Sequence, residues 1–324
     1  MAENTGEKKK ILLDFEKPVA EIYDAIAELE AMSRAQNINV DKEIAALKKR
    51  AAEKAQEIFA SLTPLNIVQI SRHQLRPNTL DYIRLLFTDF VEQKGDRLFG
   101  DDPAVVGGIA FYQGQNVAVI GHQKGHDTKE NIYRNFGMPQ PEGYRKALRI
   151  MRTAERFNFP IITFVDTPGA FPGLGAEERG QAEAIARNLL EMSKLKVPVL
   201  AIITGEGGSG GALGIAVANQ ILMLEYATYS VISPEACGSI LWRDPAQAEA
   251  AAKALKITAP DLLKLKLIDG IISEPQGGAH NDHEVAAQKI SQAIAAFLQN
   301  YSGCPADEIA AERYNKFRGL GIFS

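Results

Sequence analysis

The sequence predicts an α/β protein in which a helical hairpin precedes a parallel β-sheet. Four apolar segments each lead into a loop of small residues, and segments with helical spacing lie between them. Continuous apolar strands are typical of parallel sheets, because helices cover both faces of such a sheet. The first sixty residues differ, since their apolar side chains recur at helical spacing. A chain of 324 residues, 46% of them hydrophobic, is long enough to bury such a core.

Residues 18–62 are expected to form two amphipathic helices that are separated at the sequence "NINVD". The apolar positions of the pair are Val19, Ile22, Ile26, Leu29, Ile44, Leu47, Ala51, Ile58 and Phe59. So long a pair has little core of its own, which favours packing on another surface. We therefore assign residues 1–65 to a helical extension used for docking, residues 66–295 to the main domain and residues 296–324 to a C-terminal tail.

The main domain is expected to repeat one strand-and-loop unit, so that its units look like turns of a spiral. The units are "NVAVIGHQKG" (116–125), "PIITFVDTPGAFPG" (160–173), "PVLAIITGEGGSGG" (198–211) and "YSVISPEACG" (229–238), with helices near 143–158, 176–195 and 212–219. Parallel strands end at the same edge of a sheet, so the "DTPGAFPG" turn should open beside the glycine loop. Gly169 and Ala170 would then line a pocket, with Phe171 as an apolar wall.

Five glycines fall within residues 205–211, and several functions compete to explain them. The spacing Gly205-x-Gly207-x-x-Gly210 matches a dinucleotide-binding fingerprint, with Glu225 as the acid further on. Such a fingerprint normally belongs to the first strand–helix unit of its domain, whereas here at least two units precede it. No lysine follows the glycines, which excludes a Walker phosphate loop, and without that loop "DTPG" does not indicate a GTPase.

Two further interpretations of the glycine loop concern catalysis. The pattern Gly-x-Ser-x-Gly around Ser209 resembles the nucleophile elbow of hydrolases, and Asp269 and His280 follow in the order of a triad. However, His280 lies in the polar segment "EPQGGAHNDHE", where a histidine is usually solvated. Alternatively, Gly210 and Gly211 present N–H groups to an anionic oxygen of a ligand, since no Cβ blocks the approach. A tight turn without a ligand is the structural alternative.

Composition excludes several other classes of protein. The net charge of -4 gives no reason to expect a nucleic-acid partner. Cys237 and Cys304 are too few for a zinc site or a disulfide framework, which favours a reducing, cytoplasmic setting. The N-terminus "MAENTGEKKKILLDF" has no apolar core of a secretory signal, and no apolar run reaches the roughly 20 residues of a membrane span. We therefore expect a soluble cytoplasmic protein that binds no metal.

Three long segments resemble the alpha subunit of the bacterial and plastid acetyl-CoA carboxylase carboxyltransferase. They are "GHQKGHDTKENIYRNFGMPQPEGYRKALR", "FVDTPGAFPGLGAEERGQAEAIARNL" and "GEGGSGGALGIAVANQILMLEYATYSVISPEACGSILW". The resemblance continues through "LDFEKPVAEI", "RPNTLDYI" and "LKLIDGIISEPQGGAH", and thus covers the chain to about residue 290. Runs of this length are far more specific than a single glycine motif.

The resemblance implies a crotonase-like (ClpP/crotonase) fold, a spiral of ββα turns, with residues 66–295 as the carboxyltransferase domain. It implies transfer of a carboxyl group from carboxybiotin to acetyl-CoA, which gives malonyl-CoA in the first committed step of fatty acid biosynthesis. It also implies a beta subunit of similar fold that shares the active site and carries zinc, in an alpha2beta2 assembly. Biotin would arrive on a separate biotin carboxyl carrier protein, and ATP would be used only by a separate biotin carboxylase.

The resemblance also implies roles for individual residues. Gly210 and Gly211 would hold the ureido oxygen of biotin, with Gly207 and Gly208 lining the same pocket, while a matching loop of the beta subunit would hold the thioester oxygen. We expect Lys124, Lys129 or Arg134, from the polar segment "HQKGHDTKENIYR", to meet the carboxylate of carboxybiotin. His122 and His126 are expected to be structural. The alternatives are a noncatalytic scaffold that completes a partner's active site, and a serine hydrolase that uses Ser209.

Overall fold

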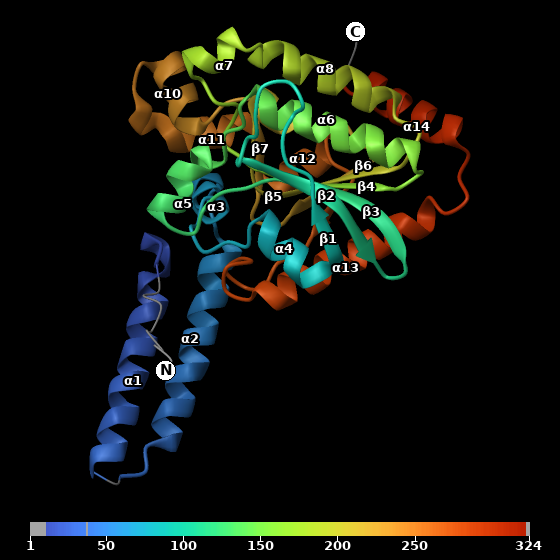
Figure 1. Ribbon diagram of the computed structural model, residues 1–324. Coiled ribbons are helices and arrows are strands. Elements are labelled where there is room, and N and C mark those ends of the chain that lie inside the picture. The colour runs from blue at the N-terminus through green and yellow to red at the C-terminus, as the bar shows by residue number, and fades with distance from the viewer. Residues whose placement is uncertain (1–10, 37, 322–324) are drawn as a thin grey trace.

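A computed structural model of the chain describes residues 11–36 and 38–321. Residues 1–10, on which part of the expectation about a secretory signal rests, lie outside the described residues. A central sheet is covered by helices on both faces, and a long helical hairpin projects from this body (Figure 1). Over the described residues, none of the helices combines the length and the apolar character that a membrane crossing requires.

Within the described residues the sheet contains eight strands in the order β1-β2-β3-β4-β5-β6-β8, and β7 pairs with the end of β5. The strands are β1 (Thr88–Glu92), β2 (Val105–Tyr112), β3 (Gln115–His122), β4 (Ile161–Thr167), β5 (Val199–Gly208), β6 (Gln220–Leu224), β7 (Thr228–Ser230) and β8 (Gly270–Ile272). Strands β3, β4, β5, β6 and β8 are parallel, which confirms the predicted parallel core. Strands β1, β2 and β3 are antiparallel, so the whole sheet is mixed.

Helices cover both faces of the sheet (Figure 1). The helices of the body are α3 (Pro64–Ser71), α4 (Thr79–Leu86), α5 (Thr128–Tyr133), α6 (Pro141–Arg156), α7 (Leu174–Glu178), α8 (Gln181–Lys194), α9 (Ser209–Leu213), α10 (Pro234–Trp242), α11 (Ala248–Leu255), α12 (Ala259–Lys264), α13 (His283–Asn300) and α14 (Ala306–Arg318), and short 3-10 turns lie at Asp14–Glu16, Asn135–Gly137 and Pro245–Gln247. Helices α6 and α8 pack together on one face, while α4 and α13 pack on the other. The core consists of apolar side chains of the sheet together with those on the inward faces of the helices.

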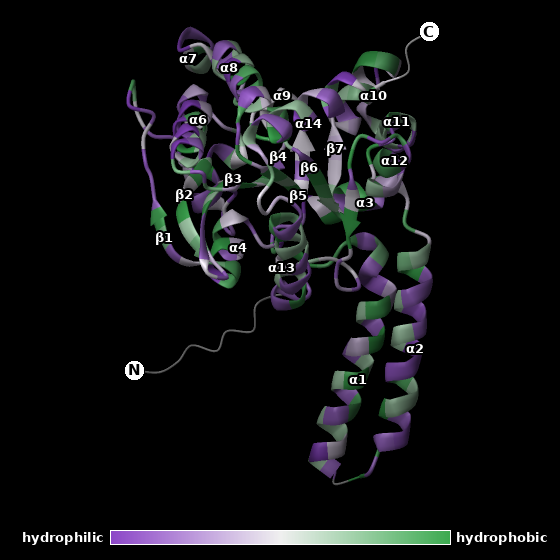
Figure 2. Cartoon of the chain, turned by 90° about the vertical axis from the view of Figure 1, so that its right-hand side faces the viewer, coloured by the Kyte–Doolittle hydropathy of each residue, from purple (hydrophilic) through white to green (hydrophobic). Residues whose placement is uncertain are grey.

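The predicted hairpin is present as α1 (Lys17–Gln36) and α2 (Asp41–Ala60). Ile26 of α1 and Ala51 and Ala55 of α2 are buried, so these small and branched side chains form part of the seam between the two helices. Figure 2 shows that hydrophilic residues cover much of the pair and that its far end extends away from the body of the protein. A projecting surface of this kind supports docking, which stays a prediction.

Two predicted elements are wrong in their extent. The unit at 229–238 is a strand only as far as Ser230, because Ser233 caps a new helix by accepting a hydrogen bond from the Ala236 N–H and Pro234 occupies its first turn. The helix expected at 212–219 begins earlier, at Ser209, and ends at Leu213. The sequence around Gly214 thus supports only one short helical segment.

The C-terminal segment is an integral part of the fold. Helix α13 crosses the predicted boundary between residues 295 and 296, and α14 packs against α8. Arg313 of α14 is fully buried and donates hydrogen bonds to the carbonyls of Met192, Leu195 and Val197 and to the Asn219 side chain. Burial lowers the pKa of Arg313 to about 10. Through these hydrogen bonds Arg313 links α14 to the end of α8 and to the loop that leads into β5.

Candidate active site

The glycine loop joins the end of β5 to the start of α9. Ser209 has a φ of 53°, a left-handed conformation that turns the chain sharply at this point. Gly210 and Gly211 follow within the first turn of α9, where backbone N–H groups have no acceptor inside the helix. Gly210 is partly exposed and Gly211 is buried. Since α9 has five residues, its dipole is short, and the individual N–H groups are the more important donors.

The turn after β4 lies directly against this loop, as the sheet topology predicts. Thr167 pairs with Gly207 in the register of β4 and β5. A Cβ on Gly208 would lie 2.1 Å from the Pro168 carbonyl oxygen, and one on Gly211 would lie 2.5 Å from the carbonyl carbon of Gly169. Contacts this short exclude a side chain at either position. These two glycines are therefore explained by the packing of one backbone on another.

Two glycines at this edge do not have that explanation. A Cβ on Gly210 would meet Ile185 at 3.8 Å, an ordinary contact, and one on Gly169 would have no neighbour within 4 Å. Gly169 also has a φ of 154°, a backbone conformation that residues with a side chain rarely adopt, and the Thr167 hydroxyl donates to its carbonyl at 2.8 Å. Packing does not require glycine at position 210. The space beside Gly210 and Gly169 is thus open for a ligand to approach the backbone.

Phe171 closes the turn but does not stand alone as a pocket wall. Its N–H donates to the Pro139 carbonyl at 2.9 Å, and its ring lies over Gly173, where a Cβ would meet the ring at 2.3 Å. The hollow that contains Gly207 and Gly208 has a volume of ≈50 Å³. This is far below the roughly 300–1,000 Å³ of typical small-molecule sites. A second surface is needed to complete a binding site at this edge.

Beneath the loop lies a network of charges that the sequence interpretation did not identify. Lys124 Nζ lies 2.7 Å from Asp166 Oδ1 and 2.8 Å from Glu206 Oε2. Arg72 Nε lies 2.7 Å from Glu206 Oε1, and Arg72 Nη1 lies 2.7 Å from Glu235. Burial alone would lower the pKa of Lys124, but the carboxylates of Asp166 and Glu206 outweigh it and raise that pKa. The charge of Lys124 is therefore already satisfied within the protein.

Asp166 carries this network into the glycine loop. Its Oδ1 accepts the backbone N–H of Glu206 at 2.9 Å, and a Cβ on Gly205 would lie 2.4 Å from the same oxygen. The signal in the sequence was an acidic residue at the end of each of two adjacent strands, in "FVDTPG" and "TGEGG". The proximity of these two carboxylates can be predicted only once the two strands are known to be neighbours.

The other two predicted cations lie apart from this network. Lys129 is exposed on α5 and has no ion pair within residues 11–36 and 38–321. Arg134 donates to the Pro103 carbonyl at 2.9 Å and lies 3.5 Å from Glu130, with 14% of its side chain exposed. The structure thus leaves Lys129 free for a ligand, while Lys124 and Arg134 are engaged by protein atoms.

The histidines have structural surroundings. His122 is fully buried, burial lowers its pKa to about 3, and its Nδ1 accepts the Asp166 N–H at 3.3 Å. His126 Nε2 lies 2.7 Å from Asp81, and that carboxylate raises the pKa of His126. Within the described ranges, no group of three or more His, Cys, Asp or Glu side chains is arranged to hold a metal ion.

The serine-hydrolase interpretation is wrong. Asp269 accepts the N–H of Ile221 at the start of β6, whereas Ser209 follows the carboxyl end of the parallel strand β5. The two residues therefore lie at opposite edges of the sheet. His280 stacks on His73 with ring centroids 3.8 Å apart, near the base of the helical hairpin. Ser209, Asp269 and His280 do not form a triad.

Comparisons with known proteins agree on one family. Residues 12–321 match the family model described as "Acetyl co-enzyme A carboxylase carboxyltransferase-like". A protein of Geobacter metallireducens named acetyl-coenzyme A carboxylase carboxyl transferase subunit alpha is 57% identical over 96% of this chain and 98% of its own length. A protein of the same name from Thermus thermophilus is 53% identical over 96% of this chain and 99% of its own length.

Solved structures show the same fold at low sequence identity. The Pseudomonas malonate decarboxylase hetero-tetramer in complex with coenzyme A aligns with a TM-score of 0.58 and 16% identity, over 75% of this chain and 93% of the matched chain. The transcarboxylase 12S hexamer, solved with methylmalonyl-coenzyme A, aligns with a TM-score of 0.57 and 19% identity, over 70% of this chain and 42% of that one. The predicted crotonase-like fold is confirmed.

Proposed function

Since the chain belongs to the family of acetyl-CoA carboxylase carboxyltransferase alpha subunits, we propose that its glycine loop holds the ureido oxygen of biotin through the N–H groups of Gly210 and Gly211. The family is that of a carboxyltransferase of fatty acid biosynthesis, in a biotin-dependent system. The observation that carries the proposal is the open space beside Gly210, where the fold does not require glycine.

The chemistry of the loop follows from the charge that develops on an oxygen during carboxyl transfer. Biotin, bound to a separate carrier protein, supplies the carboxyl group. A fixed N–H donor aimed at a developing oxyanion contributes about 3–4 kcal/mol in well-studied sites. Gly210 and Gly211 lie in consecutive positions of a first helical turn, so both donors can converge on one oxygen. Gly169 and Ala170 border the same space, and no catalytic side chain is needed.

The polar residues around the loop receive separate roles in this proposal. Lys124 holds Asp166 and Glu206 together and thereby positions the backbone that precedes the glycines. Lys129 is the cation that remains available for the carboxylate of the substrate, because its side chain is exposed and unpaired among the described residues. Arg134 instead holds the carbonyl of Pro103 beside this segment.

We further propose that a beta subunit completes the site, in an alpha2beta2 assembly where that subunit carries the zinc and the oxyanion hole for acetyl-CoA. The small hollow at Gly207 and Gly208 supports a shared site. So does the apolar surface beside it, where Val231 is 75%, Ile240 70% and Leu241 64% exposed. Exposed apolar side chains gathered in this way mark protein–protein contacts. A biotin carboxyl carrier protein and an ATP-dependent biotin carboxylase would act with this assembly in the cytoplasm.

The experiment is to assay malonyl-CoA decarboxylation with free biotin, using the purified chain alone and the chain reconstituted with a beta subunit. We expect turnover only in the reconstituted complex, and we expect Ser209→Ala to retain it, because a backbone donor does not need the hydroxyl. Carboxyl transfer by the single chain would contradict the shared site. Loss of turnover in an assembled Ser209→Ala complex would contradict catalysis by the backbone.

A further inference from the structure

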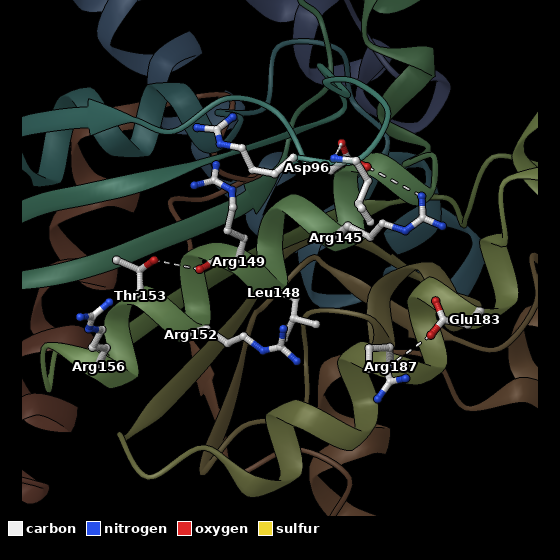
Figure 3. Close-up of a pocket in the computed structure, with 11 residues that line it drawn as sticks. Asp96, Arg145, Leu148, Arg149, Arg152, Thr153, Arg156, Glu183 and Arg187 are labelled. Carbon is white, nitrogen blue, oxygen red and sulfur yellow. Dashed lines mark hydrogen bonds and ion pairs between the residues drawn. The ribbon is translucent and has the colours of Figure 1, made fainter.

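A groove of ≈660 Å³ lies between α6, α8 and the loop after β1, and its lining is strongly basic. Figure 3 shows Arg145, Arg149, Arg152 and Arg156 along α6, with Arg187 on the neighbouring α8. Arg97 completes a set of six arginines among the described residues, against the two acidic lining residues Asp96 and Glu183. This concentration of positive charge stands in a chain whose net charge is -4.

Half of these guanidinium groups have no carboxylate partner in the described part of the chain. Arg152 lies 3.2 Å from Glu191, Arg187 lies 3.3 Å from Glu183, and Arg145 lies 3.8 Å from Asp96. By contrast, the hydrogen bonds of Arg149 all run to neutral oxygens of residues 93–95. Arg97 donates to the Lys94 carbonyl, and no hydrogen bond or ion pair is found for Arg156 among these residues.

Arg97 and Arg149 form a like-charged pair that the fold holds in place. Arg97 and Arg149 both donate to the Lys94 carbonyl, which brings their guanidinium groups together. Burial and the charge of Arg97 lower the pKa of Arg149, and the carboxylates of Asp101 and Asp96 offset this only in part. Arg97 also has a φ of 67°, an uncommon conformation for a residue with a Cβ. Asp96 builds this loop by accepting the N–H groups of Leu98, Phe99 and Gly100. An anion placed between the two arginines would relieve their repulsion.

The chemistry of the lining favours phosphate as that anion. In the described part of the chain every basic side chain of the groove is an arginine, and the planar guanidinium fork matches phosphate oxygens in pairs. Arg149 and Arg156 are seven residues apart on one helix, or roughly 10 Å along its axis. A single phosphate does not span that distance, whereas a chain of several phosphates does.

The size and surroundings of the groove favour a small ligand over a macromolecule. Its volume falls within the roughly 300–1,000 Å³ of small-molecule sites. A long nucleic acid would need further cations beyond the groove, and a chain with a net charge of -4 has no excess of them. A protein partner would require an apolar centre, and the two leucines that line the groove, Leu98 and Leu148, are too few to form one. Leu98 is 80% exposed, so it provides one apolar wall for a ligand.

We propose that this arginine groove binds a small ligand that carries several phosphates, with Arg97, Arg149 and Arg156 as its principal contacts. The ligand is an inorganic polyphosphate or the phosphate-bearing part of a nucleotide or coenzyme. The groove is separate from the glycine loop, but α6 connects them, because the Tyr144 hydroxyl donates to the Gly211 carbonyl at 3.3 Å and Arg145 is the next residue.

The test measures binding of sodium tripolyphosphate, ATP and coenzyme A to the full chain and to the reconstituted complex by titration calorimetry. Arg97→Gln/Arg156→Gln removes two charges from exposed side chains and should weaken tripolyphosphate binding by at least about tenfold. Lys42→Gln/Lys49→Gln on α2 removes the same charge elsewhere and should leave the dissociation constant within about twofold. Arg149→Gln is a third variant, used with a melting curve because its side chain holds the loop.

Comparable binding of all three ligands would assign recognition to the phosphates alone, and tighter binding of ATP and coenzyme A would add the nucleotide; both results support the site. An unchanged dissociation constant in the arginine double variant would overturn the proposal. Equal weakening in the lysine control would also overturn it, because binding would then reflect overall charge. Tighter binding of a single-stranded RNA or of a polyglutamate peptide, lost in the same arginine variant, would replace the small phosphate ligand by that macromolecule.

Discussion

Replacing Gly210 and Gly211 by alanine, one at a time, separates a ligand-binding role from a packing role. At position 210 the new methyl group would contact Ile185 at 3.8 Å, so the fold accommodates it. At position 211 it would lie 2.5 Å from the carbonyl carbon of Gly169 and 2.6 Å from the Ala170 nitrogen. Ordinary contacts begin at 3.4 Å, so the two backbone segments would have to separate by about 0.9 Å.

Both variants should lose turnover, for different reasons. In Gly210→Ala the methyl group occupies the open space where the oxygen of biotin would approach, and we expect kcat to fall by about 10²-fold with no loss of stability. Alanine even favours a helical position over glycine by up to about 1 kcal/mol. In Gly211→Ala the displaced loop should lower both kcat and the melting temperature.

The assay is malonyl-CoA decarboxylation by the reconstituted complex, with a melting curve for each variant. Gly100→Ala is the matched control, since a Cβ there has no neighbour within 4 Å and the residue lies outside the loop. The control should behave as the unmodified chain does. Full turnover by an assembled Gly210→Ala complex would refute the assignment of the Gly210 N–H to an oxyanion.

Three further predictions concern the charges that support the fold. Lys124→Met should lower the free energy of unfolding by about 3–5 kcal/mol in urea titrations, because it leaves the carboxylates of Asp166 and Glu206 without their cation. Adding Glu206→Gln to this variant should recover part of the lost stability. Additive losses from the two substitutions would contradict the pairing. Arg313→Met should cost roughly 3 kcal/mol by the same measurement, since buried carbonyls lose their donors, and an unchanged midpoint would show that α14 does not anchor the loop. The pKa of His126 is raised in the folded protein, so its pairing with Asp81 stabilises the fold below the usual histidine pKa and loses this effect as pH rises through the raised value. The difference in the free energy of unfolding between the native chain and His126→Asn should therefore disappear in alkaline buffer. A constant difference across pH would contradict this pairing.

Strand periodicity predicted the parts of the fold that depend on local pattern. The apolar runs at β3, β4 and β5 and the seam of the hairpin were identified from side-chain spacing. The extent of α9 and α10 was not, because Ser233 and Pro234 start a helix inside a segment that reads as a strand. Strand β7 is three residues long and is defined by its pairing with β5, which spacing alone does not reveal.

The sequence predicted that two loops are neighbours, but it did not predict the ion pairs around them. The neighbouring positions of residues 168–170 and the glycine loop follow from parallel topology alone. The partner of a charged side chain does not, since Lys124 meets Asp166 and Glu206 from strands that are far apart in the sequence. The groove on α6 was likewise missed, because Arg97 and Arg187 join the helix from other segments.

The direct contact between Gly208, Gly211 and the turn at residues 168–170 makes the two loops a single mechanical unit. Neither loop can move without displacing the other, so the width of the space beside Gly210 and Gly169 is fixed by both loops together. Lengthening one loop alone to admit a bulkier ligand would bring it into collision with the other loop. Coordinated changes in both segments would be required.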